Sequence, residues 1–139
     1  MDANIVIAAF LRDSTVRRIL AVSFVEFFAP EFLKEELEAH LPVLRERAGL
    51  SAGAARELLQ IIEGYVTTIP QEALLLHWEE ATEAMAGIDP KDAAYVAAAL
   101  AVPCDGIWSD DPHLRGQRTV ACWTTKALVG DLRGRGLRL

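Results

Sequence analysis

The stretch "GIDPKDAAYVAAALAV", residues 87 to 102, places two aspartates in front of an almost wholly apolar run. Wound as a helix at about 100° per residue, that run leaves no polar face except the arc near Asp92. The stretch therefore predicts a helix over residues 90 to 101 that is buried on nearly all sides. Asp89 at the N-cap, Pro90 at N1 and Asp92 at N3 suit the start of this helix, and capping alone accounts for both acids unless other acids are placed like them.

Length and composition favour one domain spanning residues 1 to 139. The chain is 52% hydrophobic with a mean hydropathy of +0.20, so it can bury a core without disulfide or metal staples. Cys104 and Cys122 lack CxxC spacing, and two packed free thiols in a reducing, cytoplasmic setting are expected. We predict no membrane association, because no segment approaches the about 20 apolar residues of a span and no signal-peptide pattern is found.

Charge is unevenly distributed along the chain. The net charge is −6, with a net −8 over residues 26 to 85 and a net +3 over residues 126 to 139. Overall acidity argues against non-specific binding of polyanions, although the basic C-terminal strip can still meet a phosphate backbone. A solvated tail is the alternative interpretation of that strip.

Short β-like runs alternate with helical stretches. The expected strands cover residues 4 to 10, 23 to 30, 65 to 70, 106 to 109 and 119 to 123. The expected helices cover residues 15 to 22, 31 to 47, 51 to 63, 71 to 85, 90 to 101 and 125 to 133. This alternation predicts an α/β layered fold with a mostly parallel central sheet of about five short strands.

Acidic residues flank two of the expected strands. Ligands usually bind beyond the carboxyl ends of parallel strands, and Asp110 and Asp111 follow the strand "GIWS" directly. Ordinary turn chemistry with Pro112 is the alternative. At the N-terminus, Asp2 and Asn4 are two positions apart on a strand-like segment, so we expect their side chains to point the same way.

One glutamate of the expected helix over residues 31 to 47 stands apart from the others. The predicted inward arc of this helix is defined by six residues: Phe32, Leu33, Leu37, His40, Leu41 and Leu44. Glu36 falls inside the margin of that arc, whereas the neighbouring glutamates fall on the opposite face. A carboxylate at the margin of a core is costly unless it is paired or bound to a cation. Pairing with His40 or Arg47 is the purely structural explanation.

Four acids thus come from separate elements, each near an element end or a buried face: Asp2, Glu36, Asp92 and Asp111. Mg²⁺ and Mn²⁺ prefer oxygen ligands, and several mutually repelling carboxylates are tolerated around such a charge. The pattern therefore indicates a site for Mg²⁺ or Mn²⁺.

At these residues the sequence resembles the PIN domain (PilT N-terminus) family, which includes VapC-type toxins. The resemblance covers most of the chain and rests on four motifs: "DAN" at 2 to 4, "APEFLKEELEAH" at 29 to 40, "DPKDAAYVAAALA" at 89 to 101 and "GIWSDD" at 106 to 111. It implies a three-layer α/β/α fold in which the four acids hold the metal and also serve as the catalytic residues.

The resemblance also assigns supporting residues. Asn4 and Ser109 are expected to support the site by hydrogen bonding, and whether Asp110 contributes is open. One departure concerns the N-terminus, because family members usually carry an apolar strand before the first acid and here only Met1 precedes Asp2. A short strand, a start assigned late and an impaired site are the three interpretations of this departure.

The resemblance implies a metal-dependent ribonuclease that hydrolyses phosphodiester bonds in RNA. Bound Mg²⁺ or Mn²⁺ would lower the pKa of a water and neutralise charge on the leaving oxygen, and one carboxylate is a candidate to accept the proton. RNA needs basic residues around such an acidic pocket. The candidates for these phosphate contacts are Arg17, Arg18, Lys91, Arg115 and Arg118.

Two other functions compete with the ribonuclease. A catalytically inactive PIN fold would act as an interaction or RNA-binding module without binding metal. A phosphatase-like hydrolase would need an Asp-x-Asp motif after the first strand, which "DAN" does not supply. If the toxin analogy holds, the helical segments over residues 31 to 63 form a protruding pair that suits an antitoxin or the second subunit of a homodimer.

Overall fold

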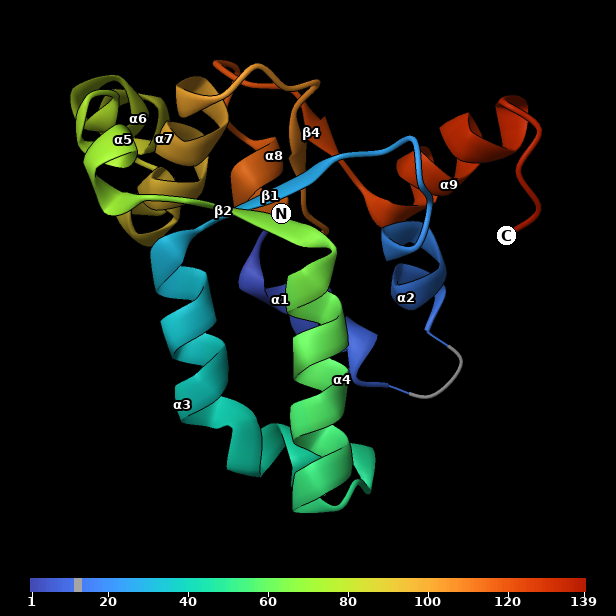
Figure 1. The fold of residues 1–139 in the computed structure, drawn as a ribbon. Helices are drawn as coiled ribbons and strands as arrows, with labels where there is room; N and C mark the ends of the chain where they lie inside the picture. Colours follow the sequence, from blue (N-terminus) through green and yellow to red (C-terminus); the bar gives the residue numbers. More distant parts are fainter. Residues whose placement is uncertain (12–13) are drawn as a thin grey trace.

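The computed structural model describes residues 1–11 and 14–139 and combines many helices with four short strands within that part of the chain (Figure 1). The helices are α1 (Ala3–Ala9), α2 (Thr15–Leu20), α3 (Glu31–Ala48), α4 (Ala52–Gly64), α5 (Gln71–Leu75), α6 (Trp78–Met85), α7 (Ala93–Ala101), α8 (Pro112–Arg115) and α9 (Thr125–Gly134), with a 3₁₀ turn, η1 (Pro90–Asp92), before α7. The strands are β1 (Phe27–Pro30), β2 (Val66–Ile69), β3 (Ile107–Trp108) and β4 (Cys122–Trp123).

The strands form two separate parallel pairs. In one pair β1 lies beside β2, with Phe27 opposite Val66, and in the other β3 lies beside β4, with Ile107 opposite Cys122. The prediction of parallel pairing is confirmed, and a mixed α/β structure is observed. A single sheet of about five strands is not seen, because the two pairs share no ladder in the described part of the chain.

The predicted strand over residues 4 to 10 is wrong, since this segment is helix α1. Its buried side chains recur at helical spacing: Ile5, Val6, Ala9 and Phe10. Asp2 caps the helix, because its carboxylate accepts a hydrogen bond from the Ile5 backbone N–H at 3.1 Å. The β-branched run "IVI" suggested a strand, but packing and this cap override that weak preference.

The predicted start of the apolar helix is also corrected. The Asp92 N–H donates to the Asp89 carbonyl at 3.2 Å, which makes a 3₁₀ turn, and α7 then begins at Ala93. Asp92 stands at the N-cap rather than at N3, and its side chain makes no capping hydrogen bond. Capping therefore does not explain the Asp92 carboxylate.

Helix α7 is buried as predicted, because its small side chains allow close approach of neighbouring elements. Its buried residues are Ala93, Tyr95, Val96, Ala97 and Ala98. It packs against α5, α6, β1 and β3. The predicted helix over residues 71 to 85 is split into α5 and α6, and the short α8 was not expected.

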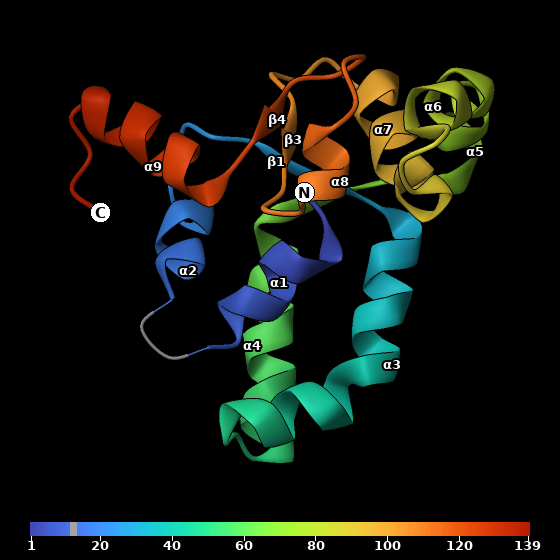
Figure 2. The same ribbon diagram turned by 180° about the vertical axis from the view of Figure 1, so that it is seen from behind.

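Helices α3 and α4 form the expected pair and project away from the sheets (Figures 1 and 2). The four leucines of the α3 arc are all buried, as predicted. Glu36 and His40 are exposed, so the expectation that these two residues lie inside the arc is wrong. A glutamate at the margin of an apolar stripe has a side chain long enough to turn its charge toward water.

Two clusters of buried apolar residues meet at β3. Trp108 belongs to the cluster built around α1 to α4, and its neighbour Ile107 belongs to the cluster built around α5 to α8. Adjacent residues of a strand point to opposite faces, so this two-residue strand joins both clusters.

Cys104 and Cys122 are free thiols, as predicted, although Cys104 is exposed. Among the described residues no helix is long and apolar enough to cross a membrane.

Gly106→Ala is expected to destabilise the β3–β4 pair. Gly106 has a φ of 142°, and a Cβ there would lie 2.5 Å from the Ala121 carbonyl oxygen, which accepts the Ile107 N–H at 2.8 Å. We expect a loss of about 2 kcal/mol or more in the free energy of unfolding, measured by urea denaturation. The control is Gly130→Ala in α9, where a Cβ meets nothing within 4 Å. An equal loss in both variants would contradict the argument.

Candidate metal centre

Asp2 is a buried carboxylate that connects the start of α1 to the end of β3. It is 4% exposed, and one carboxylate oxygen accepts the Ile5 N–H while the other accepts a short hydrogen bond from the Ser109 hydroxyl. The same Ser109 Oγ accepts the Asp111 N–H at 3.0 Å. Burial raises the pKa of Asp2, the hydrogen bonds from Ser109 and Ile5 oppose the shift, and the nearby Asp111 charge adds to it. Ser109 therefore holds two of the predicted acids in one place.

Asp92 lies beside these acids with an unsatisfied oxygen. Its Oδ2 atom is buried and has no hydrogen-bond partner within the described part of the chain. The pKa of Asp92 is raised, first by burial and then by the charges of Asp111, Asp89 and Asp2. A carboxylate oxygen that is buried among like charges without a partner is costly unless a cation or proton compensates it. This arrangement fits a divalent cation with oxygen ligands.

Asp111 begins α8 and faces a histidine that the sequence analysis did not single out. Its Oδ1 accepts the His113 N–H at 2.9 Å and lies 3.6 Å from His113 Nδ1. The same Nδ1 atom is 3.5 Å from Asp89 Oδ2. Asp89, Asp92 and His113 each offer a ligand atom, and these atoms lie within 4.8 Å of one another. This group can hold a metal ion next to the Asp2 and Asp111 carboxylates.

The sequence assigned Asp89 only to capping and gave His113 no role. Both residues lie inside or beside motifs already noted, since Asp89 is three positions before Asp92 and His113 is two positions after Asp111. A search for His near paired acids would have found this signal. Their convergence depends on the way η1 and α8 face each other, which residue spacing does not show.

Glu36 stands at the border of this cluster rather than inside it. Its side chain is exposed on α3, and the described residues show no ion pair between it and either His40 or Arg47. The predicted structural explanation for Glu36 is therefore not observed. Its negative charge acts on the Tyr95 hydroxyl, so Glu36 lies on the side of α3 that faces the site.

Tyr95 lies among the predicted acids and connects them to α1. Its hydroxyl accepts the Ala3 N–H at 3.3 Å. Burial raises the pKa of Tyr95 well above its ordinary value, and the charges of Asp2, Glu36 and Asp92 raise it further. Tyr95 therefore stays neutral. The charges of Asp2, Glu36 and Asp92 all act on its hydroxyl, so the three acids lie near the same group.

Asp110 contacts α9 in this structure, and the side chain of Asn4 is exposed. Asp110 is exposed and accepts the Thr125 N–H at 2.7 Å and the Thr125 hydroxyl at 2.6 Å. That hydroxyl also accepts from the Trp108 indole at 3.0 Å, so Asp110 ties α9 to the end of β3. Asn4 is exposed, and it does not share the direction of Asp2, because positions two apart in a helix face different sides.

The predicted RNA contacts fall in two groups. The Arg17 guanidinium donates to the Ala9 and Leu11 carbonyls, at the end of α1 opposite Asp2, and the exposed Arg18 lies beside it on α2. The exposed Arg115 and Arg118 instead follow the Asp111 loop closely: Arg115 ends α8 and Arg118 lies just beyond it. The side chain of Lys91 lies outside the described residues.

Asp92→Asn is expected to raise the melting temperature of the metal-free protein by a few degrees at pH 7. A raised pKa in the folded state means that ionised Asp92 opposes folding, so wild-type stability falls as pH rises from the unfolded pKa through the folded one. The gain should vanish near pH 3, where both chains are neutral at this position. Mn²⁺ should raise the melting temperature of the wild type and of exposed Glu57→Gln, but raise that of Asp92→Asn much less. A larger Mn²⁺ effect in Asp92→Asn would contradict this assignment.

Comparison with known proteins agrees with the geometry. The family model described as PIN domain matches residues 1–133 of the 139. No curated protein and no solved structure matches the chain. The matched region contains every residue of the acidic cluster, from Asp2 to His113. The chain belongs to the PIN domain family, as its four motifs indicated.

Proposed function

We propose that this protein is a metal-dependent ribonuclease that hydrolyses RNA phosphodiester bonds at the acidic cluster. PIN domains are generally nucleases that use divalent metal ions. The observation that carries the proposal is the buried Asp92 Oδ2, which lacks a hydrogen-bond partner among the described residues. The charges of Asp111, Asp89 and Asp2 act on the same carboxylate. Buried polar atoms are nearly always satisfied, so an exception inside a carboxylate cluster supports a bound ion.

Asp2, Asp92 and Asp111 would hold Mg²⁺ or Mn²⁺, with Glu36 at the edge of the site. When bound, the cation supplies Lewis acidity that activates a water and neutralises charge on the phosphate. The side chains of the protein position the reacting groups and move the proton. Ser109 fixes the Asp2 carboxylate through its hydroxyl, and Tyr95, whose hydroxyl accepts the Ala3 N–H, stays neutral near it. One of the carboxylates of the cluster is also a candidate to accept the proton of the attacking water.

RNA would approach across the loop that follows Asp111. Arg115 and Arg118 are exposed on either side of the buried Gln117, whose amide bonds the Leu114 and Val120 backbone and keeps this loop in shape. Two cations on an ordered loop next to a carboxylate site suit phosphate contacts on both sides of the scissile bond. The Arg17 guanidinium instead donates to backbone carbonyls at the end of α1, so its contribution to RNA binding is expected to be indirect.

We further propose a role as the toxin of a toxin–antitoxin pair that acts as a homodimer. The support is the VapC-like motif set and the projecting α3–α4 pair, which exposes Val43 and Ile61. An antitoxin gene beside this one and slowed growth on expression are the expected signs. A catalytically inactive interaction or RNA-binding module is the second candidate, and the exposed position of Glu36 outside the cluster favours it.

Asp111→Asn is expected to lower Mn²⁺-dependent cleavage of single-stranded RNA by about 100-fold or more, because several kcal/mol of charge stabilisation are lost. Asparagine remains a good N-cap for α8, so the fold should be retained. The matched control is Asp110→Asn, which changes the adjacent acid that contacts Thr125. This variant should keep cleavage within a few-fold. No Mn²⁺-dependent cleavage by the wild type, with RNA binding intact, would select the inactive module.

Reversing the charge of both loop arginines, Arg115→Glu and Arg118→Glu, should raise KM for RNA about tenfold or more while kcat changes little. The salt dependence of binding should also weaken, because fewer counterions are released from the phosphate backbone. The control is Arg56→Glu on α4, a single exposed arginine remote from the loop. Unchanged KM and unchanged salt dependence in the double variant would remove these arginines from the RNA surface.

A further inference from the structure

A histidine and two aspartates meet where η1 faces α8. Asp89, Asp92 and His113 each offer a ligand atom, and these atoms lie within 4.8 Å of one another. Among the residues that the structure describes, this is the one group of three histidine, cysteine or acidic side chains with that spacing. The chemistry proposed above uses Asp92 but neither Asp89 nor His113.

The local backbone directs these three side chains toward one another. The Asp92 N–H donates to the Asp89 carbonyl in a 3₁₀ turn, and side chains three residues apart in such a turn lie one above the other. On α8, the His113 N–H donates to Asp111 Oδ1 at 2.9 Å, which places the imidazole beside that carboxylate. The His113 side chain is 58% exposed, and that of Asp89 is 29% exposed. An ion can therefore reach the group from solvent.

The separations between the ligand atoms suit metal coordination better than direct hydrogen bonding. His113 Nδ1 is 3.5 Å from Asp89 Oδ2 and 3.6 Å from Asp111 Oδ1. An N–H···O hydrogen bond is about 2.7 to 3.2 Å long, so both separations exceed it. Neighbouring ligands of an octahedral ion with bonds of about 2.1 Å lie about 3.0 Å apart, and opposite ligands lie about 4.2 Å apart. Both measured separations fall between these two values.

Asp92 gives an independent indication of a cation at this group. Its buried Oδ2 has no hydrogen-bond partner within the described part of the chain, although buried polar atoms nearly always have one. The charges of three neighbouring carboxylates repel that of Asp92, and the imidazole of His113 opposes them. The group therefore carries an excess of negative charge, which a divalent ion would neutralise.

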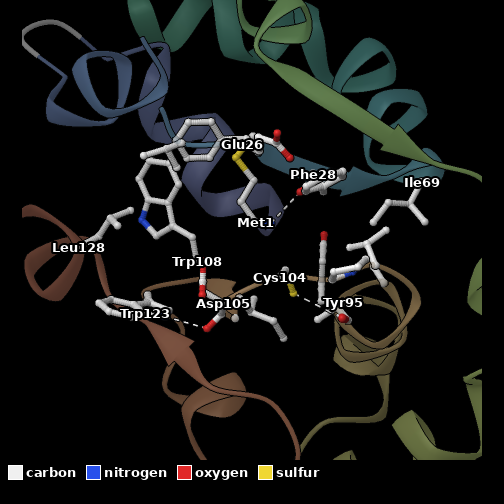
Figure 3. A pocket seen from close by; sticks show the side chains of 18 of the residues that line it. Met1, Glu26, Phe28, Ile69, Tyr95, Cys104, Asp105, Trp108, Trp123 and Leu128 are labelled. Atoms are coloured by element: carbon white, nitrogen blue, oxygen red, sulfur yellow. Dashed lines mark hydrogen bonds between the residues drawn. The ribbon is translucent and has the colours of Figure 1, made fainter. Parts of the chain in front are cut away.

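The pocket between the two strand pairs, about 460 Å³ in volume, offers no comparable group among the described residues. Figure 3 shows its labelled acids, Glu26 and Asp105, on opposite sides of the pocket. Much of the remaining lining is apolar or aromatic, as at Phe28 and Trp108. The contacts that suit a metal ion are therefore found at η1 and α8 and not in this pocket.

An imidazole nitrogen changes which ion such a group prefers. Mg²⁺ takes oxygen ligands and keeps several waters, whereas first-row transition metals also accept nitrogen, with affinity rising from Mn²⁺ to Co²⁺. We propose that His113 Nδ1 is a ligand of the metal centre, together with Asp89 and Asp92, and that it makes the centre select transition-metal ions over Mg²⁺. The inference rests on the metal site of the proposed function, but its test needs neither RNA nor cleavage.

The test measures binding of Co²⁺ alone and of Mg²⁺ alone to the full chain by titration calorimetry. His113→Gln should weaken Co²⁺ binding about tenfold or more and change Mg²⁺ binding by less than about threefold. The visible absorption of bound Co²⁺ should also shift, because a nitrogen ligand is lost. The backbone N–H at this position can still donate to Asp111 Oδ1, so the start of α8 should be retained. The matched control is His40→Gln, an exposed histidine outside the group, which should change neither affinity nor absorption.

Asp89→Asn separates the nitrogen ligand from the charge of the group. This variant removes one negative charge and leaves the Asp89 carbonyl that makes the 3₁₀ turn, so both ions should bind more weakly and the ratio of their affinities should change little. Unchanged binding of both ions would contradict Asp89 as a ligand.

A purely ionic role of His113, as a cation paired with Asp89 and Asp111, predicts a different result. His113→Gln would then bind both ions equally well or more tightly, and that result would overturn the inference. Co²⁺ binding that His113→Gln leaves unchanged would overturn this inference alone. Failure of the wild type to bind any divalent ion would overturn both this inference and the proposed metal-dependent function.

Discussion

The hydroxyl of Ser109 is the contact on which the candidate site depends. It donates to the Asp2 carboxylate and accepts the Asp111 N–H, so it joins the start of α1 to the loop after β3. Ser109 is fully buried, and it directly follows β3, where the two core clusters meet. The pKa of Asp92 is raised first by its burial, and the charges of Asp111, Asp89 and Asp2 near it raise that pKa further.

Much of the fold could be predicted from residue patterns, and the failures have identifiable causes. Helices α3 and α7 could be predicted from the leucine spacing of the first and the apolar run of the second, because their burial follows from a 3.6-residue period. The segment of α1 was mistaken for a strand because three β-branched residues dominate it, whereas Asp2 and four core contacts decide its conformation. The single sheet was expected from the alternation of strands and helices, and alternation alone does not determine which strand edges pair.

The residues of the candidate site could likewise be predicted only in part. Asp2, Asp92 and Asp111 were predicted because acids at the ends of elements stand out in a sequence, and Ser109 was predicted from the family resemblance. The motifs did not identify His113, whose approach to Asp89 depends on the tertiary packing of two short turns. Glu36 shows the opposite error, since angular position on a helix says nothing of how far a flexible side chain extends.

The bond between Asp2 and Ser109 spans 107 residues of sequence, nearly the full length of the chain. During synthesis Asp2 emerges before its partners at positions 109 and 111. The acidic cluster can assemble only after that later segment has emerged from the ribosome. The closure of such a long loop also belongs to the slow, non-local part of folding. Topology alone therefore delays the assembly of the acidic cluster in a growing chain.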